Sequence, residues 1–107
     1  MIYRRMFVSH GTYRNRKLLD LARNMSCVEC GTDDGTIVAA HSNQGKGMGI
    51  KASDATIMFL CYRCHTELDS GKTMSRDEKR QFSYKNNAKT LQLLLEEGYI
   101  NVTGKRG

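Results

Sequence analysis

The segment TIMFLCYRCHTELD, residues 56–69, decides the fold of this chain. It begins with a β-branched and apolar run at residues 56–60, which predicts a short strand. The strand leads directly into the motif Cys61-x-x-Cys64, after which the chain predicts a helix. His65 and Asp69 are four positions apart on that helix and therefore lie on one face. The segment thus predicts a strand, a tight turn with two thiols and a helix in direct succession.

A second motif, Cys27-x-x-Cys30, precedes this segment. Two such turns can place four thiolates at the corners of a tetrahedron, the geometry that zinc prefers. A chain of 107 residues has a small core, and a structural zinc adds about 10–16 kcal/mol of apparent binding energy to folding. We therefore predict one structural Zn²⁺ held by Cys27, Cys30, Cys61 and Cys64. Two disulfides or a redox-active C-x-x-C motif are the alternatives, and a reducing compartment disfavours disulfides.

The first residues of the sequence indicate the cellular compartment in which we expect the protein. Residues 1–8, MIYRRMFV, are interrupted by Arg4 and Arg5, and no apolar run has the length of a signal peptide or a membrane span. We therefore expect a cytoplasmic protein with no membrane partner.

The segments around the two motifs predict a single domain over residues 1–107. A short amphipathic helix is predicted within residues 13–25, with Leu18, Leu21 and Ala22 on one stripe. Residues 36–40 predict a strand that ends at His41, and the glycine-containing residues 42–54 predict a loop to the second strand. The two strands are then expected to form a hairpin-like pair.

A last helix is predicted over residues 75–98. Ser75 and Glu78 form the S-x-x-E pattern of a capping box, and Gly98 is a typical helix stop. The helix has an apolar stripe made of Phe82, Ala88, Leu91, Leu94 and Leu95. The chain thus divides into a basic arm and helix at 1–26, a cysteine-framed core at 27–70 and this helix.

The net charge of +6 is unevenly distributed. Residues 1–26 carry +5, residues 27–74 carry −2 and residues 75–107 carry +3. Basic flanks around a mildly acidic centre suit a polyanion held beside a cation site, so DNA is the expected partner. Arg14, Arg16 and Lys17 are the predicted nucleic-acid contacts. A solvated basic surface without a partner is the alternative.

The order of these motifs resembles a known family. Cys27-x-x-Cys30, a strand ending in His41, a glycine-rich loop and a strand leading into Cys61-x-x-Cys64-His65 are similar to the HNH nucleases with their ββα-metal fold. The resemblance covers residues 27–70. It is strongest to small prophage-encoded nucleases of the YbcO-like group, which share an Ala-His strand end and an ending like CYRCHTELD. The resemblance implies a small α+β domain of ββα-metal type with flanking N- and C-terminal helices.

The resemblance also implies a role for each matching residue. His41 would be the general base that activates water, and His65 with Asp69 would hold a catalytic divalent ion, Mg²⁺ or another. Asp69 falls where the family usually has its final histidine. Ala40 and Thr56 depart from the pattern, because alanine cannot bind metal and threonine only partly imitates the asparagine that orients the base.

Asp54 or Ser42 could compensate for these departures. Without the resemblance, a lone histidine at a strand end, such as His41, is more often a structural or surface residue than a general base. His65 and Asp69 then form an i, i+4 pair that stabilises their helix.

The function that the resemblance implies is a phage or prophage HNH-like endonuclease, which hydrolyses DNA phosphodiester bonds in the cytoplasm of a bacterial host. The first alternative is a non-catalytic, zinc-containing DNA-binding or recombination-accessory module. The second is an interaction module for phage recombination or replication proteins, in which the C-terminal helix docks a partner. Cleavage of DNA with a divalent metal would separate the enzyme from both alternatives.

Overall fold

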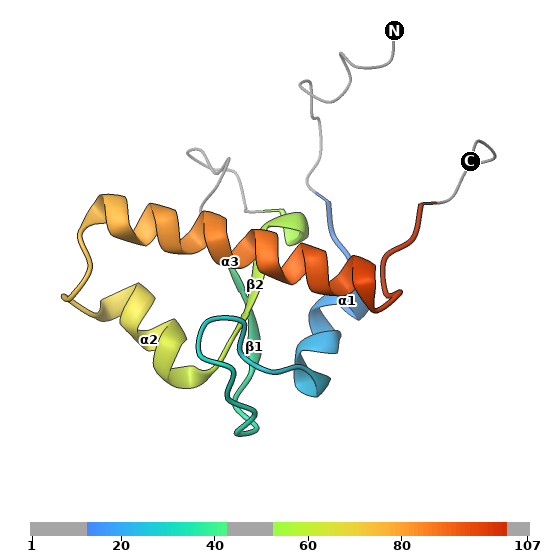
Figure 1. Cartoon of the computed structure of the whole chain (residues 1–107), viewed down its shortest axis with the longest axis horizontal. Helices are drawn as coiled ribbons and strands as arrows, with labels where there is room; N and C mark the ends of the chain where they lie inside the picture. Colours follow the sequence, from blue (N-terminus) through green and yellow to red (C-terminus); the bar gives the residue numbers. More distant parts are fainter. Residues whose placement is uncertain (1–12, 43–52, 103–107) are drawn as a thin grey trace, which may run out of the picture.

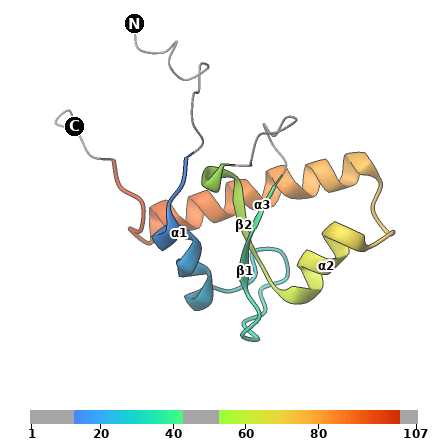
Figure 2. The same cartoon turned by 180° about the vertical axis from the view of Figure 1, so that it is seen from behind.

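The computed structural model describes residues 13–42 and 53–102. The chain forms a small α+β fold in which a two-stranded antiparallel sheet is covered by a long helix (Figure 1). The elements, in order, are α1 (Arg16–Asp20), the 3₁₀ helix η2 (Leu21–Asn24), β1 (Val38–His41), the 3₁₀ helix η3 (Asp54–Thr56), β2 (Ile57–Leu60), α2 (Tyr62–Ser70) and α3 (Arg76–Glu96). Figures 1 and 2 show α3 running across the hairpin, with α1 and α2 on opposite sides of it.

The hairpin confirms the predicted pair of strands. Val38 lies opposite Leu60, and His41 lies opposite Ile57. The first strand begins later than expected and includes His41 as its last residue. The second begins at Ile57, because the residues before it form η3. The Ser53 hydroxyl caps this turn by accepting a hydrogen bond from the Ala55 amide.

The predicted N-terminal helix is present as α1 followed by η2. Asn15 is its N-cap, since its side-chain oxygen accepts a hydrogen bond from the Leu18 amide at 3.1 Å. Leu18 and Ala22 are buried, and Leu21 packs against the same cluster. The predicted apolar stripe therefore faces the core.

The start of α3 is as predicted, and its buried face is so in part, because Leu94 is fully buried and Phe82 packs against the core. Ser75 and Glu78 make both hydrogen bonds of a capping box. Ala88 and Leu95, assigned to the apolar stripe, are exposed. The residues of α3 that are buried are Asn86, Thr90 and Leu94.

The reason lies in the open edge of β2. The Phe59 amide donates a hydrogen bond to the Thr90 hydroxyl at 3.2 Å. The Asn87 side chain donates to the carbonyl oxygens of Ala55 and Ile57 at 3.0 and 2.9 Å. Buried backbone groups on a strand edge need partners, and polar side chains of α3 provide them. The helix is thus placed by hydrogen bonds as well as by apolar contact.

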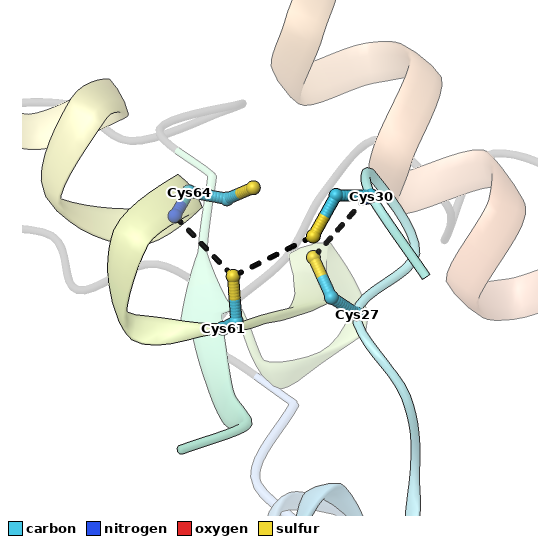
Figure 3. A group of neighbouring side chains, drawn as sticks. All are labelled: Cys27, Cys30, Cys61 and Cys64. Carbon is cyan, nitrogen blue, oxygen red and sulfur yellow. Dashed lines mark hydrogen bonds between the residues drawn. The ribbon is translucent and has the colours of Figure 1, made fainter. Parts of the chain in front are cut away.

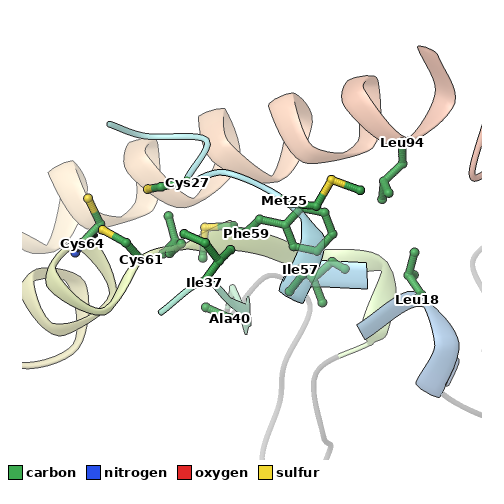
Figure 4. Packing of buried hydrophobic residues seen from close by; sticks show 13 residues of the cluster. Leu18, Met25, Cys27, Ile37, Ala40, Ile57, Phe59, Cys61, Cys64 and Leu94 are labelled. Atoms are coloured by element: carbon green, nitrogen blue, oxygen red, sulfur yellow. Dashed lines mark hydrogen bonds between the residues drawn. The ribbon is translucent and has the colours of Figure 1, made fainter. Parts of the chain in front are cut away.

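The hydrophobic core lies between β2, α1 and α3 (Figure 4). All four residues of β2 are buried, and Phe59 and Leu94 are fully buried. The cluster continues into Cys27, Cys61 and Cys64. The thiols therefore extend the core instead of standing apart from it.

Two predictions lie outside the described residues. These are the beginning of the basic arm, residues 1–12, and most of the glycine-rich loop, residues 43–52. Within residues 13–42 and 53–102, no helix combines the length and apolar character needed to cross a membrane.

Candidate metal centre and candidate active site

The four cysteines form one cluster, as predicted (Figure 3). Their sulfur atoms all lie within 4.8 Å of one another, and the Sγ atoms of Cys30 and Cys61 are 3.8 Å apart. All four are free thiols. Four sulfurs bound tetrahedrally at about 2.3 Å to one zinc ion stand about 3.8 Å apart. The cluster therefore has the donor set and the size to hold a structural metal ion such as zinc.

The backbone around each motif positions the thiols. Cys61 is the N-cap of α2, and its sulfur accepts a hydrogen bond from the Cys64 amide at 3.5 Å. The Cys27 sulfur accepts from the Cys30 amide at the same distance of 3.5 Å. Gly31 follows with φ near +81°, a conformation that favours glycine, and its amide donates to the Cys27 carbonyl. Each motif is thus a turn closed by N–H···S bonds.

The electrostatics of the cluster favour a thiolate at one position. A hydrogen bond from the Thr32 backbone, helped by bonds from the other thiols, lowers the pKa of Cys30 to about 7. Burial, together with the neighbouring thiols, raises the pKa of Cys64. The guanidinium of Arg63 lies beside Cys30, whose hydrogen bond and charge raise the pKa of Arg63. The thiolate is the form of cysteine that binds metal, so the lowered pKa of Cys30 favours metal binding at this residue.

A second centre lies at the opposite end of the hairpin, around His41. Its Nε2 atom is 2.8 Å from the Asp54 Oδ1 atom. The Asp54 side chain is only 4% exposed, whereas that of His41 is 32% exposed. Asp54 also accepts hydrogen bonds from the Asn15 amide at 2.7 Å and from Arg14 Nη1 at 3.3 Å. A buried carboxylate therefore holds a partly exposed imidazole.

The same contacts decide the charge of Asp54. Burial raises the pKa of this carboxyl, but several favourable contacts oppose the effect of burial. These are the hydrogen bonds from His41 and the Asn15 amide, and the charges of His41 and Arg14, and together they bring the pKa below its ordinary value. Asp54 is thus ionised at neutral pH and remains a hydrogen-bond acceptor for the imidazole.

The geometry assigns the contact with His41 to Asp54 and not to Thr56. The Thr56 hydroxyl donates to the Ser53 carbonyl at 2.7 Å and closes the η3 turn. Asp54, the first residue of that turn, is the one that contacts the imidazole. Ala40 is buried and packs in the hydrophobic core. Asp54 is one of the two residues that the sequence analysis gave as able to compensate for Thr56, and η3 brings its carboxylate to the imidazole.

His65 and Asp69 lie on one face of α2, as expected. Their Nε2 and Oδ2 atoms are 3.0 Å apart, and both side chains are partly exposed. Two neighbouring ligands on an octahedral ion with bonds of about 2.1 Å have this separation. Among the described residues, only the four cysteines form a group of three or more metal-binding side chains. This pair could therefore offer two protein ligands to an ion.

A cleft of about 610 Å³ joins several of these residues. His41 and Asp69 both line it, and His65 does not. Its other wall is the first half of α3, which contributes Arg76, Lys79 and Arg80. The cleft therefore places an imidazole and a carboxylate opposite a row of cations.

The predicted nucleic-acid contacts have different surroundings. Arg14 pairs with Asp54 and so supports the His41 centre. Arg16 pairs with Asp20 at 3.4 Å on the exposed surface of α1, and Lys17 is exposed. Sequence analysis missed the cations of α3, although the run RDEKR at 76–80 contained the signal. Its positions 76, 79 and 80 share one face of a helix.

The comparisons with known proteins supply no further identification. No protein-family model, curated protein or solved structure matches the chain. Any function must therefore be argued from the geometry of the two centres and from the resemblance of the motifs.

Proposed function

We propose that this chain is a metal-dependent endonuclease of HNH type, which hydrolyses DNA phosphodiester bonds on a zinc-stabilised ββα-metal core. One observation carries the proposal: an imidazole that a buried carboxylate holds at 2.8 Å also faces a cleft lined by cations. An oriented imidazole is the commonest general base near neutral pH, and cations beside it suit a phosphate backbone.

In this proposal His41 takes the proton from the attacking water. Asp54 accepts the hydrogen bond from the Nε2–H group, which fixes the tautomer and leaves the Nδ1 lone pair free. Because Asp54 stays ionised, it also stabilises the imidazolium that forms when the water is deprotonated. A positioned general base contributes about 10²–10⁴-fold to the rate.

Asp69 and His65 would hold the catalytic divalent ion, which when bound stabilises negative charge on the phosphate and the leaving oxygen. Magnesium commonly binds through one or two carboxylates and keeps several waters, so a site with few protein ligands suits it. Arg76, Lys79 and Arg80 would hold the phosphates on either side of the scissile bond. The four cysteines would hold Zn²⁺ as a structural ion, outside the reaction.

The direct test is the substitution His41→Ala, assayed on labelled DNA with Mg²⁺ or Mn²⁺. The expected result is a loss of cleavage of about 10²–10⁴-fold with unchanged zinc content and DNA affinity, because phosphate contacts dominate binding. Gln81→Ala is a suitable control, since this exposed residue of α3 does not line the cleft. If the wild type cleaves and His41→Ala cleaves equally well, the assignment is wrong at its centre.

A non-catalytic, zinc-containing DNA-binding or recombination-accessory module is the second candidate. The observation that favours it is the absence, among residues 13–42 and 53–102, of a three-ligand metal group other than the cysteines. The two candidates differ in one result. DNA binding without cleavage under Mg²⁺, Mn²⁺, Ni²⁺ or Zn²⁺ would select the binding module.

A further inference from the structure

The wall of the cleft that α3 forms has a regular chemical order. Arg76, Arg80 and Tyr84 follow one another at four-residue intervals, so their side chains lie in one row along the helix. All three line the cleft, and Lys79 and Ser83 lie beside this row. A row of two cations followed by an aromatic ring therefore runs along the wall opposite His41.

Tyr84 is 48% exposed and does not belong to the core cluster, which lies on another face of α3. Packing in the core therefore does not account for this ring. An accessible aromatic ring beside cations is the feature with which proteins stack the bases of unpaired strands. In a duplex each base is already stacked between its neighbours, so the ring would have no free base face to contact.

The size of the cleft points the same way. Its volume of about 610 Å³ is in the range of sites that enclose small ligands. A space of this size can take one nucleotide with its phosphate, and it is too small for a double helix. An unpaired strand can bring one nucleotide into this space, beside His41 and the cations of α3.

We infer that the cleft accepts an unpaired DNA strand, with one base stacked on Tyr84 and the adjoining phosphates held by Arg76, Lys79 and Arg80. The inference rests on the proposed function for the identity of the ligand as DNA. It adds the class of substrate: single strands, flaps or frayed ends, in preference to continuous duplex.

The acidic groups near the cleft do not oppose this. Arg80 pairs with Asp77 at 3.5 Å, but both side chains are well exposed, and a surface pair of this kind contributes little and opens easily. Among the described residues, Arg76 and Lys79 make no ion pair with a carboxylate. Asp69 is one carboxylate in a lining that also contains Arg76, Lys79 and Arg80.

The experiment measures binding of the full chain, with its zinc, by fluorescence anisotropy without added divalent ion. The probes are a labelled oligothymidylate of about 12 nucleotides, within the usual range of single-strand sites, and a blunt duplex of the same length. The single strand should bind at least about tenfold more tightly than the duplex. Tyr84→Ala should weaken single-strand binding by about five- to 150-fold, and Tyr84→Phe should retain it.

Tyr99→Ala is the matched control, because Tyr99 is 50% exposed and lies outside the cleft. This variant should bind like the wild type. Equal or tighter duplex binding would overturn the inference, as would an equal effect of Tyr84→Ala and Tyr99→Ala. An RNA strand of the same length is a further arm, and tighter binding of RNA would overturn the assignment to DNA.

The outcome is separable from that of the proposed function. If single strands bind in a Tyr84-dependent manner but no metal supports cleavage, the inference holds and the proposed nuclease function is wrong. Cleavage of continuous duplex that depends on His41 and is indifferent to Tyr84→Ala would keep the nuclease and remove the inference.

Discussion

The substitution Asp54→Asn isolates the role of the buried carboxylate. Asparagine keeps the size and one acceptor oxygen of aspartate but replaces the second oxygen with a donor group. In the folded chain both carboxylate oxygens face donors, from His41 and Arg14 on one side and from the Asn15 amide on the other. Wherever the amide group points, it must oppose a donor or reverse the hydrogen bond to the imidazole.

The expected loss of stability follows from these contacts. A hydrogen bond to a buried charged group contributes about 1.5–3 kcal/mol. The pair with Arg14 adds little, because the arginine is 45% exposed. We therefore expect Asp54→Asn to lower the free energy of unfolding by about 2–3 kcal/mol, and the melting temperature by about 10–20 °C. Asp20→Asn, which removes the exposed partner of Arg16, should cost less than about 1 kcal/mol.

The same variant should slow cleavage. If the amide group donates to His41 Nε2, the imidazole proton is displaced to Nδ1, the atom that the proposed reaction needs as acceptor. Single-turnover cleavage, measured at a temperature where both proteins are folded, should fall by about 10²–10⁴-fold. A variant that is destabilised as expected but cleaves at the wild-type rate would refute the orienting role. A variant as stable as Asp20→Asn would refute the electrostatic argument as well.

The pH dependence supplies an independent check. The folded-state pKa of Asp54 is lowered, so its contribution to stability is present above the unfolded pKa of about 3.9 and is lost as the pH falls through the folded value. The difference in unfolding free energy between wild type and Asp54→Asn should therefore shrink below about pH 4. Acid acts on the rest of the fold equally in both proteins, and taking the difference cancels that shared effect. A difference that stays constant into strong acid would contradict the lowered pKa.

Three further outcomes are expected. Purified protein should contain about one zinc per chain by elemental analysis, and a chelator should unfold it, because the thiols are part of the core; a metal-free folded protein would contradict this. His65→Ala should impair cleavage through weaker affinity for the divalent ion, so that excess metal partly restores the rate; a loss that no metal concentration restores would oppose the ligand role. Thr90→Val should lower the free energy of unfolding, measured in urea, by about 1–3 kcal/mol, because the buried Phe59 amide loses its acceptor. The control Thr73→Val, at an exposed position, should change it little.

The parts of the fold that the sequence predicted are those encoded locally. The C-x-x-C turns, the strand before Cys61 and the helix after it follow from neighbouring residues, and each lies where expected. The i, i+4 relation of His65 and Asp69 is likewise a property of any helix. The capping box at Ser75 needed only four consecutive residues to be identified. These features depend little on the rest of the chain.

The contacts that sequence analysis did not predict join distant parts of the chain. Asp54 is held by Arg14 and Asn15, 40 and 39 positions away, and no periodic pattern connects these segments. Thr90 is buried because it meets the Phe59 amide 31 positions away. A search for apolar periodicity cannot find a helix face whose polar side chains form hydrogen bonds with the backbone at the edge of a strand. Buried polar residues are therefore where local prediction fails in this chain.

The two centres are mechanically connected through β2. Cys61 directly follows its last residue, and Ile57, its first, lies opposite His41 in the hairpin. From Ile57 to Cys61 the strand extends by about 13 Å, and its four residues are all buried. The helix that carries Asp69 also begins at the Cys61 turn, while α3 is hydrogen-bonded to β2 through Thr90. The three elements that line the cleft, β1, α2 and α3, are therefore all joined to β2, the strand that leads into Cys61. A metal at the cysteines would then govern the geometry around His41 without touching it, and for that reason a structural ion would be required for cleavage.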